Sequence, residues 1–118
     1  MSVIYIQGGG PLEGECQVQG AKNSVLPILA GCLLTREPVV IRNCPHLSDV
    51  DAAVDILQHL GGCCMWQGDT LVVDTSGVCR PSIDQGRMQA MRSSIIFLGP
   101  MVARMGEATL TYPGGCEL

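Results

Sequence analysis

The fold of this chain is decided by residues 20–34, GAKNSVLPILAGCLL, in which one lysine and one asparagine precede an almost wholly apolar run. An amphipathic surface helix keeps a polar face for water, and this stretch has none. We therefore predict a helix over about 23–34 that is buried on all sides. Pro27 favours a start near Asn23, because a proline in the first turn removes no intrahelical hydrogen bond. Lys22 then lies at the helix N-terminus, where free amide groups and the helix dipole suit an anion.

The composition fits one small domain with an aliphatic core. Of the 118 residues, 47% are hydrophobic and 15% charged, with one Trp, two Tyr and one Phe. The net charge of −4, without a run of Lys or Arg, argues against nucleic acid or a membrane surface as the partner. The N-terminus lacks the basic region of a signal peptide, and the apolar run is too short to span a bilayer.

The seven cysteines are odd in number and never fall as C-x-x-C, so we expect neither a metal site nor a disulfide framework. A reduced, cytoplasmic location follows. Cys116 differs from the other six because it follows Pro-Gly-Gly in a loop, where a thiol is accessible for acid–base or nucleophilic work. Free thiols in loops are often inert, so an inert Cys116 stays an alternative.

The rest of the chain alternates strands and helices, which predicts an α/β (α+β) fold. Strands are expected at 3–6, 14–19 and 39–43, the first two joined by a loop with three glycines. A helix starts at Ser48 as N-cap and stops at Gly61-Gly62, and a hairpin turns at Gly68-Asp69. After a loop over 76–86, a helix over 87–105, interrupted at Gly99-Pro100, and a strand over 107–112 begin a second unit that stops short.

Several charged residues and one asparagine are candidates for a binding site or for structural roles. Lys22 and Asn23 form either a solvated surface pair or an anion site. Arg92 interrupts an apolar helix, and a buried arginine needs partners, so it is either structurally paired or points into a cleft. Arg104 near the helix end complements the helix dipole, and the carboxylates of Asp49 and Asp51 are best explained as first-turn helix charges.

Several motifs together resemble the N-terminal part of the UDP-N-acetylglucosamine 1-carboxyvinyltransferase family. They lie, in order, at residues 20–23 with 26–29, 49–51, 91–95, 98–100, 102–104 and 113–116. The resemblance spans essentially all 118 residues. Asn23 and Cys116 distinguish this family from the related enzyme of the shikimate pathway.

The resemblance implies transfer of the enolpyruvyl group from phosphoenolpyruvate to the 3′-hydroxyl of UDP-N-acetylglucosamine, the first committed step of peptidoglycan synthesis. It implies that Lys22 and Asn23 bind phosphoenolpyruvate and that Arg92 contacts the UDP-sugar. Lys22 would neutralise the phosphate and the charge that develops as the C–O bond breaks. Cys116 would be the general acid and the target of the antibiotic fosfomycin. No metal or organic cofactor is implied.

The resemblance also implies an inside-out α/β barrel of repeated βαβαββ units, incomplete here. Residues 1–21 would be strands that belong with another domain, 22–75 the first repeat unit, and 76–118 the start of a second, truncated at the Cys116 loop. We therefore expect an N-terminal fragment that is inactive alone and self-associates through unpaired strands. The alternative is a non-catalytic α/β module that uses Lys22 to bind an anion.

Overall fold

The computed structural model describes residues 2–112, which contain four α-helices, two short 3₁₀ helices and five strands. The helical elements are α1 (Lys22–Gly31), η1 (Cys32–Leu34), α2 (Ser48–Leu60), α3 (Gln85–Gln89), η2 (Ser94–Phe97) and α4 (Leu98–Met105). The strands are β1 (Val39–Ile41), β2 (Cys63–Gln67), β3 (Thr70–Asp74), β4 (Ser82–Ile83) and β5 (Thr109–Leu110). The predicted mixed α/β class is confirmed, and the described residues form no closed barrel.

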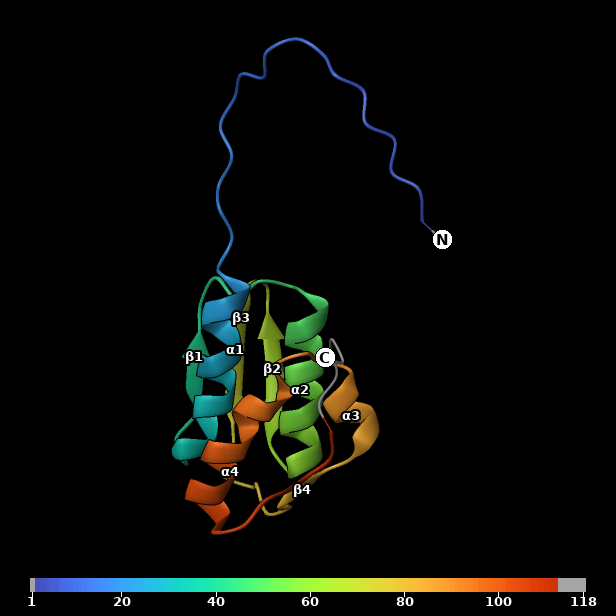
Figure 1. The fold of residues 1–118 in the computed structure, drawn as a ribbon. Coiled ribbons are helices and arrows are strands. Elements are labelled where there is room, and N and C mark those ends of the chain that lie inside the picture. Colours follow the sequence, from blue (N-terminus) through green and yellow to red (C-terminus); the bar gives the residue numbers. More distant parts are fainter. Residues whose placement is uncertain (1, 113–118) are drawn as a thin grey trace.

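A three-stranded sheet with the order β1-β3-β2 supports the helices. β3 is antiparallel to both neighbours, so β1 and β2 run parallel to each other, and α2 is the crossover between them. Figure 1 shows α1 and α2 side by side over one face of this sheet. Leu71 and Val73 of β3 point to that face and are fully buried. The predicted order of helix, strand, helix and hairpin over residues 22–75 is therefore confirmed.

Helix α2 ends where predicted, and its apolar residues recur at helical spacing on the side that faces the core. Val50, Ala53, Leu57 and Leu60 all lie in the core, and Gly61 ends the helix with a left-handed φ of 114°. The predicted N-cap is wrong by one residue. Leu47 occupies the cap position without a side-chain hydrogen bond, and the serine after it is already helical.

Helix α1 is not buried on all sides, which corrects the prediction from its apolar sequence. Val25, Leu26 and Leu29 are buried, whereas the side chain of Ile28 is 48% exposed. Within residues 2–112, α1 contacts α2 and η2 and lies over one face of the sheet (Figure 1), which leaves its other side exposed. The helix also begins one residue earlier than predicted, which makes Pro27 its sixth residue. Because proline has no N–H group, the helix lacks one backbone hydrogen bond at this exposed position.

The two strands predicted at 3–6 and 14–19 do not form. Residues 2–19 lie exposed and extend away from the body as a single arm, without the predicted hairpin (Figure 1). Tyr5 is 93% and Leu12 101% exposed. A strand gains its hydrogen bonds only from a neighbouring strand, and the arm meets none.

The helix predicted over 87–105 is broken at 90–93 instead of at Gly99-Pro100. Pro100 is tolerated because it lies in the first turn of α4. Before α4, the buried hydroxyl of Ser94 donates to the carbonyl of Met88 at 2.7 Å, a local bond that competes with helical pairing. The loop predicted over 76–86 contains β4, which pairs in parallel with β5.

Arg104 ties α4 to the rest of the molecule. Its guanidinium donates to the carbonyls of Leu33 and Thr35 at 3.0 Å each, and to the carbonyl of Thr75 at 2.7 Å. The arginine therefore caps carbonyls at the end of the α1–η1 segment, in addition to lying in the last turn of its own helix. Its partners are distant in the sequence, and dipole reasoning on one helix did not find them.

Candidate anion-binding site

Lys22 and Asn23 are the first two residues of α1, and both are exposed. The ammonium nitrogen of Lys22 lies 3.1 Å from a carboxylate oxygen of Asp49, in the first turn of α2. The Lys22 side chain is 49% exposed and that of Asp49 is 23% exposed. An ion pair thus joins the N-terminal turns of the two helices.

The fold brings these two turns together. α1 and α2 run side by side in the same direction, and both begin at the end of the molecule where the arm leaves (Figure 1). Their cap residues, Ala21 and Leu47, make no side-chain hydrogen bond to the first turn. The leading backbone N–H groups of both helices therefore lack a side-chain acceptor, and two positive dipole ends lie next to each other.

At these two helix N-termini, the acidic first-turn residues all belong to α2. Asp49 and Asp51 lie in the first turn of α2, and the first turn of α1 holds no acidic residue. The interpretation of both aspartates as first-turn charges fits their place in α2, but Asp49 also contacts Lys22. Sequence reasoning missed that contact because it treated each helix alone. A cation beside two such helix ends can bind a phosphate or a carboxylate.

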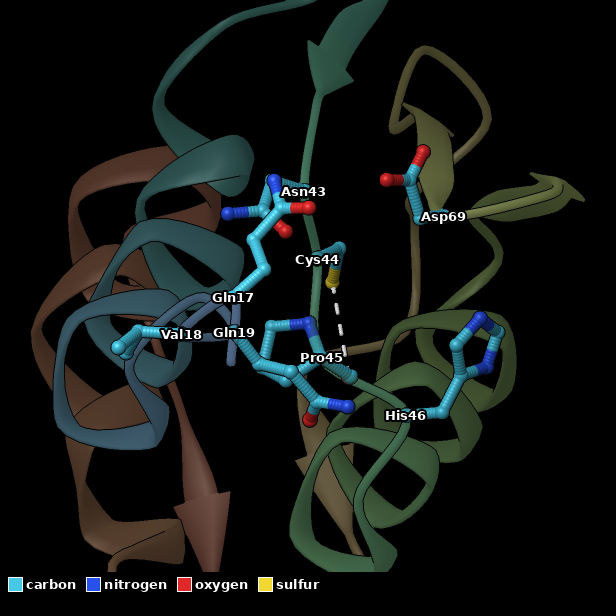
Figure 2. A pocket seen from close by; sticks show the side chains of 8 residues that line it. All are labelled: Gln17, Val18, Gln19, Asn43, Cys44, Pro45, His46 and Asp69. Carbon is cyan, nitrogen blue, oxygen red and sulfur yellow. Dashed lines mark hydrogen bonds between the residues drawn. The ribbon is translucent and has the colours of Figure 1, made fainter. Parts of the chain in front are cut away.

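A hollow of about 250 Å³ lies between the last residues of the arm, the turn after β1 and the tip of the β2–β3 hairpin. Figure 2 shows the residues that line it, namely Gln17, Val18, Gln19, Asn43, Cys44, Pro45, His46 and Asp69. The turn after β1 is held in place by His46, whose Nε2–H donates a 3.1 Å hydrogen bond to the Gly68 carbonyl and whose ring stacks on Trp66 with the ring centres 4.0 Å apart.

A second hollow of about 170 Å³ runs between the start of α1 and the end of β1. Gly20 lines it, and a Cβ at this position would lie 2.2 Å from the carbonyl oxygen of Asn43. Only glycine allows this approach of the arm to the turn. Lys22 and Asn23 line neither of these two hollows, and both residues are exposed at the start of α1.

The other two predicted site residues lie elsewhere in the chain. Arg92 is exposed, in the segment between α3 and η2, so its predicted burial is wrong because the helix breaks at this point. Lys22 and Asn23 share one helical turn, whereas Arg92 belongs to a separate segment. Cys116 lies outside the described residues.

The described cysteines comprise buried thiols, exposed thiols and the half-buried Cys64. Cys32 and Cys44 are buried, and burial raises the pKa of the Cys32 thiol to about 11. Cys16, Cys63 and Cys79 are exposed. Within residues 2–112 we find no group of three or more His, Cys, Asp or Glu side chains placed to hold a metal ion. The same range contains no helix with the length and apolar character needed to cross a membrane.

Comparison with known proteins places the chain among carboxyvinyltransferases. Residues 6–118 match the family model of EPSP synthase (3-phosphoshikimate 1-carboxyvinyltransferase). UDP-N-acetylglucosamine 1-carboxyvinyltransferase 2 of Caldanaerobacter subterraneus is 44% identical over 118 residues, all of this chain and 28% of that protein. The corresponding enzyme of Blochmanniella pennsylvanica is 46% identical over 115 residues, 98% of this chain and 27% of that protein.

A solved structure is also similar. The enolpyruvyl transferase NikO from Streptomyces tendae matches with a TM-score of 0.75 and 26% identity, over 82% of this chain and 23% of that one. The chain thus spans between a fifth and a third of the length of the proteins it matches.

Proposed function

Because this chain belongs to the EPSP synthase family of carboxyvinyltransferases, we propose that it forms part of an enzyme that transfers an enolpyruvyl group from phosphoenolpyruvate to a hydroxyl. We further propose that the acceptor is the 3′-hydroxyl of UDP-N-acetylglucosamine, in the first committed step of peptidoglycan synthesis in the cytoplasm. Support for this acceptor comes from relatives that carry its name and are 44% and 46% identical over nearly all of the chain.

The observation that carries the proposal is the place of Lys22. It is the only lysine of the 118 residues, and it opens α1 next to two helix N-termini without side-chain caps. An ammonium there neutralises the phosphate of phosphoenolpyruvate and stabilises the negative charge that develops as the C–O bond breaks. The side-chain amide of Asn23, in the same turn, adds hydrogen-bonding capacity for the same ligand.

The remaining roles follow from the family resemblance. The sugar hydroxyl loses its proton as its oxygen attacks the enol carbon of phosphoenolpyruvate, and Cys116 protonates the methylene carbon, which becomes a methyl group. Phosphate then leaves as the methyl group gives up one proton, and the new enol ether forms. Arg92 contacts the UDP-sugar through its guanidinium. We propose no metal or organic cofactor. The division of the chain into an N-terminal arm, a first unit over 22–75 and a second unit over 76–118 belongs to the same proposal.

The direct test is a titration of the 118-residue chain with phosphoenolpyruvate, followed through its backbone amide resonances. We expect changes concentrated at the start of α1 that disappear in Lys22→Ala. Equal binding by the two proteins would contradict the proposal. Inorganic phosphate binding as tightly as phosphoenolpyruvate would favour the non-catalytic anion-binding module instead. With both substrates present the chain alone should release no phosphate, and detectable product would overturn that expectation.

A further inference from the structure

We propose that Asp49 is a positioning residue, which holds the ammonium group of Lys22 over the N-termini of α1 and α2. This inference rests on the proposed function, because it concerns how Lys22 meets the phosphate of phosphoenolpyruvate. The observation that carries it is the 3.1 Å ion pair between the two side chains. The pair connects the first residue of one helix with the first turn of its neighbour.

Lys22 needs such a partner for two physical reasons. A cation in the first turn of a helix is repelled by the positive end of the dipole, and here two such ends are adjacent. The lysine side chain also has several freely rotating bonds and is 49% exposed, so little packing restrains it. Without Asp49 the ammonium would move out into solvent, away from the helix ends.

Asp49 is well placed to hold the ammonium group of Lys22. Its side chain is short and only 23% exposed, and it stands on a helix that the core fixes firmly. The next residue, Val50, is fully buried, as is Ala53 one turn later. The carboxylate therefore occupies a defined place relative to both helix ends. Asp51 lies in the same turn but is exposed, so it offers a matched control with the same charge.

Asp49 affects an incoming anion in two opposite ways. Its own negative charge repels the anion, while the orientation of Lys22 lowers the entropy lost on binding. Replacing an aspartate by asparagine removes the repulsion in either position, but only the change at Asp49 releases Lys22. The two variants therefore separate positioning from simple charge by the sign of the effect.

The first experiment needs no ligand. Because Lys22 is the only lysine, a chain labelled with ¹³C and ¹⁵N at lysine gives one side-chain signal. We expect the order parameter of its terminal carbon to fall in Asp49→Asn, to stay at the wild-type value in Asp51→Asn and to be largely kept in Asp49→Glu. An unchanged order parameter in Asp49→Asn overturns the inference. Matching backbone amide spectra confirm that each variant is folded.

The second experiment measures the affinity of the wild-type chain and of the same variants for phosphoenolpyruvate. We expect Asp49→Asn to bind about three- to tenfold more weakly than wild type, and Asp51→Asn to bind equally or slightly more tightly. If Asp49→Asn binds as tightly as Asp51→Asn, the inference is overturned. If wild type binds no phosphoenolpyruvate, the proposed function fails, while the order parameter of Lys22 still decides the role of Asp49.

Discussion

Arg104 and Thr75 are joined twice, because the guanidinium donates to the Thr75 carbonyl at 2.7 Å and to its hydroxyl oxygen at 3.3 Å. The hydroxyl in turn donates to the carbonyl of Thr35 at 2.7 Å. Thr75 is 1% exposed, so these groups have little access to water. One guanidinium and one hydroxyl thus satisfy carbonyls from segments that lie far apart in the sequence.

Arg104→Ala should lower the free energy of unfolding by about 2–3 kcal/mol, since it leaves several carbonyls without a charged donor. Urea unfolding followed by circular dichroism measures this change. Arg36→Ala, at an exposed position, is the control and should shift the midpoint little. Equal midpoints for the two variants would show that the Arg104 contacts add nothing to stability.

Replacement by alanine should change the stability of the fold in opposite directions at Gly20 and at Gly31. Gly20→Ala should destabilise the fold by about 1–3 kcal/mol, because its Cβ would lie 2.2 Å from the Asn43 carbonyl oxygen. Gly31→Ala should stabilise it by about 0.5–1 kcal/mol, because Gly31 is helical and its Cβ would meet nothing within 4 Å. Thermal unfolding of both variants tests the pair, and a stable Gly20→Ala would refute the close approach.

Cys116 should be the cysteine that fosfomycin modifies in the full-length protein. Peptide mapping after incubation identifies the adduct, and the other cysteines serve as internal controls. Cys32 should stay unmodified, because burial raises its pKa to about 11 and keeps the thiol protonated near neutral pH. The exposed thiol of Cys16 reports any unselective reaction. Absence of an adduct at Cys116 would remove its proposed role.

The decrease in the free energy of unfolding at acid pH should depend in part on Asp84. The hydrogen bond from Arg87, 2.7 Å long, holds the pKa of the Asp84 carboxyl below its ordinary value of 3.8. Between the lower folded pKa and the unfolded pKa, the unfolded chain binds more protons, so stability rises with pH there. The contribution is complete above the unfolded pKa and is lost as pH falls through the folded one.

Asp84→Asn should therefore flatten the loss of stability below about pH 4, in urea unfolding measured from pH 2 to pH 6. Glu37→Gln, at an exposed position, controls for the change in net charge. If both variants keep the wild-type slope, the Asp84 pair does not contribute to acid unfolding.

The N-terminal arm should drive association without adding to stability. Residues 2–19 are exposed and form no strand, so their deletion should leave the unfolding temperature unchanged. The same deletion should abolish concentration-dependent association in sedimentation velocity, because the arm carries strand-forming residues without a partner. A full chain that stays monomeric at every concentration would contradict this.

Local signals were enough to predict the central part of the fold. The periodic apolar residues of α2, its glycine stop and the Gly68-Asp69 hairpin each depend on neighbours a few positions away. The arm was predicted wrongly because strand propensity needs a partner strand to be realised. The break at 90–93 was missed because the buried Ser94 hydroxyl bonds backwards to Met88.

The site was predicted from sequence only where its residues are adjacent. Lys22 and Asn23 were proposed from the start of one helix, and both lie in its first turn, although the prediction began the helix at Asn23 and left Lys22 before it. Asp49, 27 positions later, meets Lys22 only because α2 crosses the sheet beside α1. No pattern within either helix contains that contact. The same holds for Arg104, whose acceptors lie 29 to 71 positions away.

The central place of β3 also constrains the order of folding. β1 and β2 each pair only with β3, which is the last of the three strands along the chain. A growing chain can form α1 and α2 early, but it cannot begin the sheet until β3, which starts at Thr70, is being synthesised. The β2–β3 hairpin closes in microseconds because its loop is short, whereas pairing Val39 with Val73 closes a much longer loop. Docking of β1 onto the finished hairpin should therefore be the rate-limiting step.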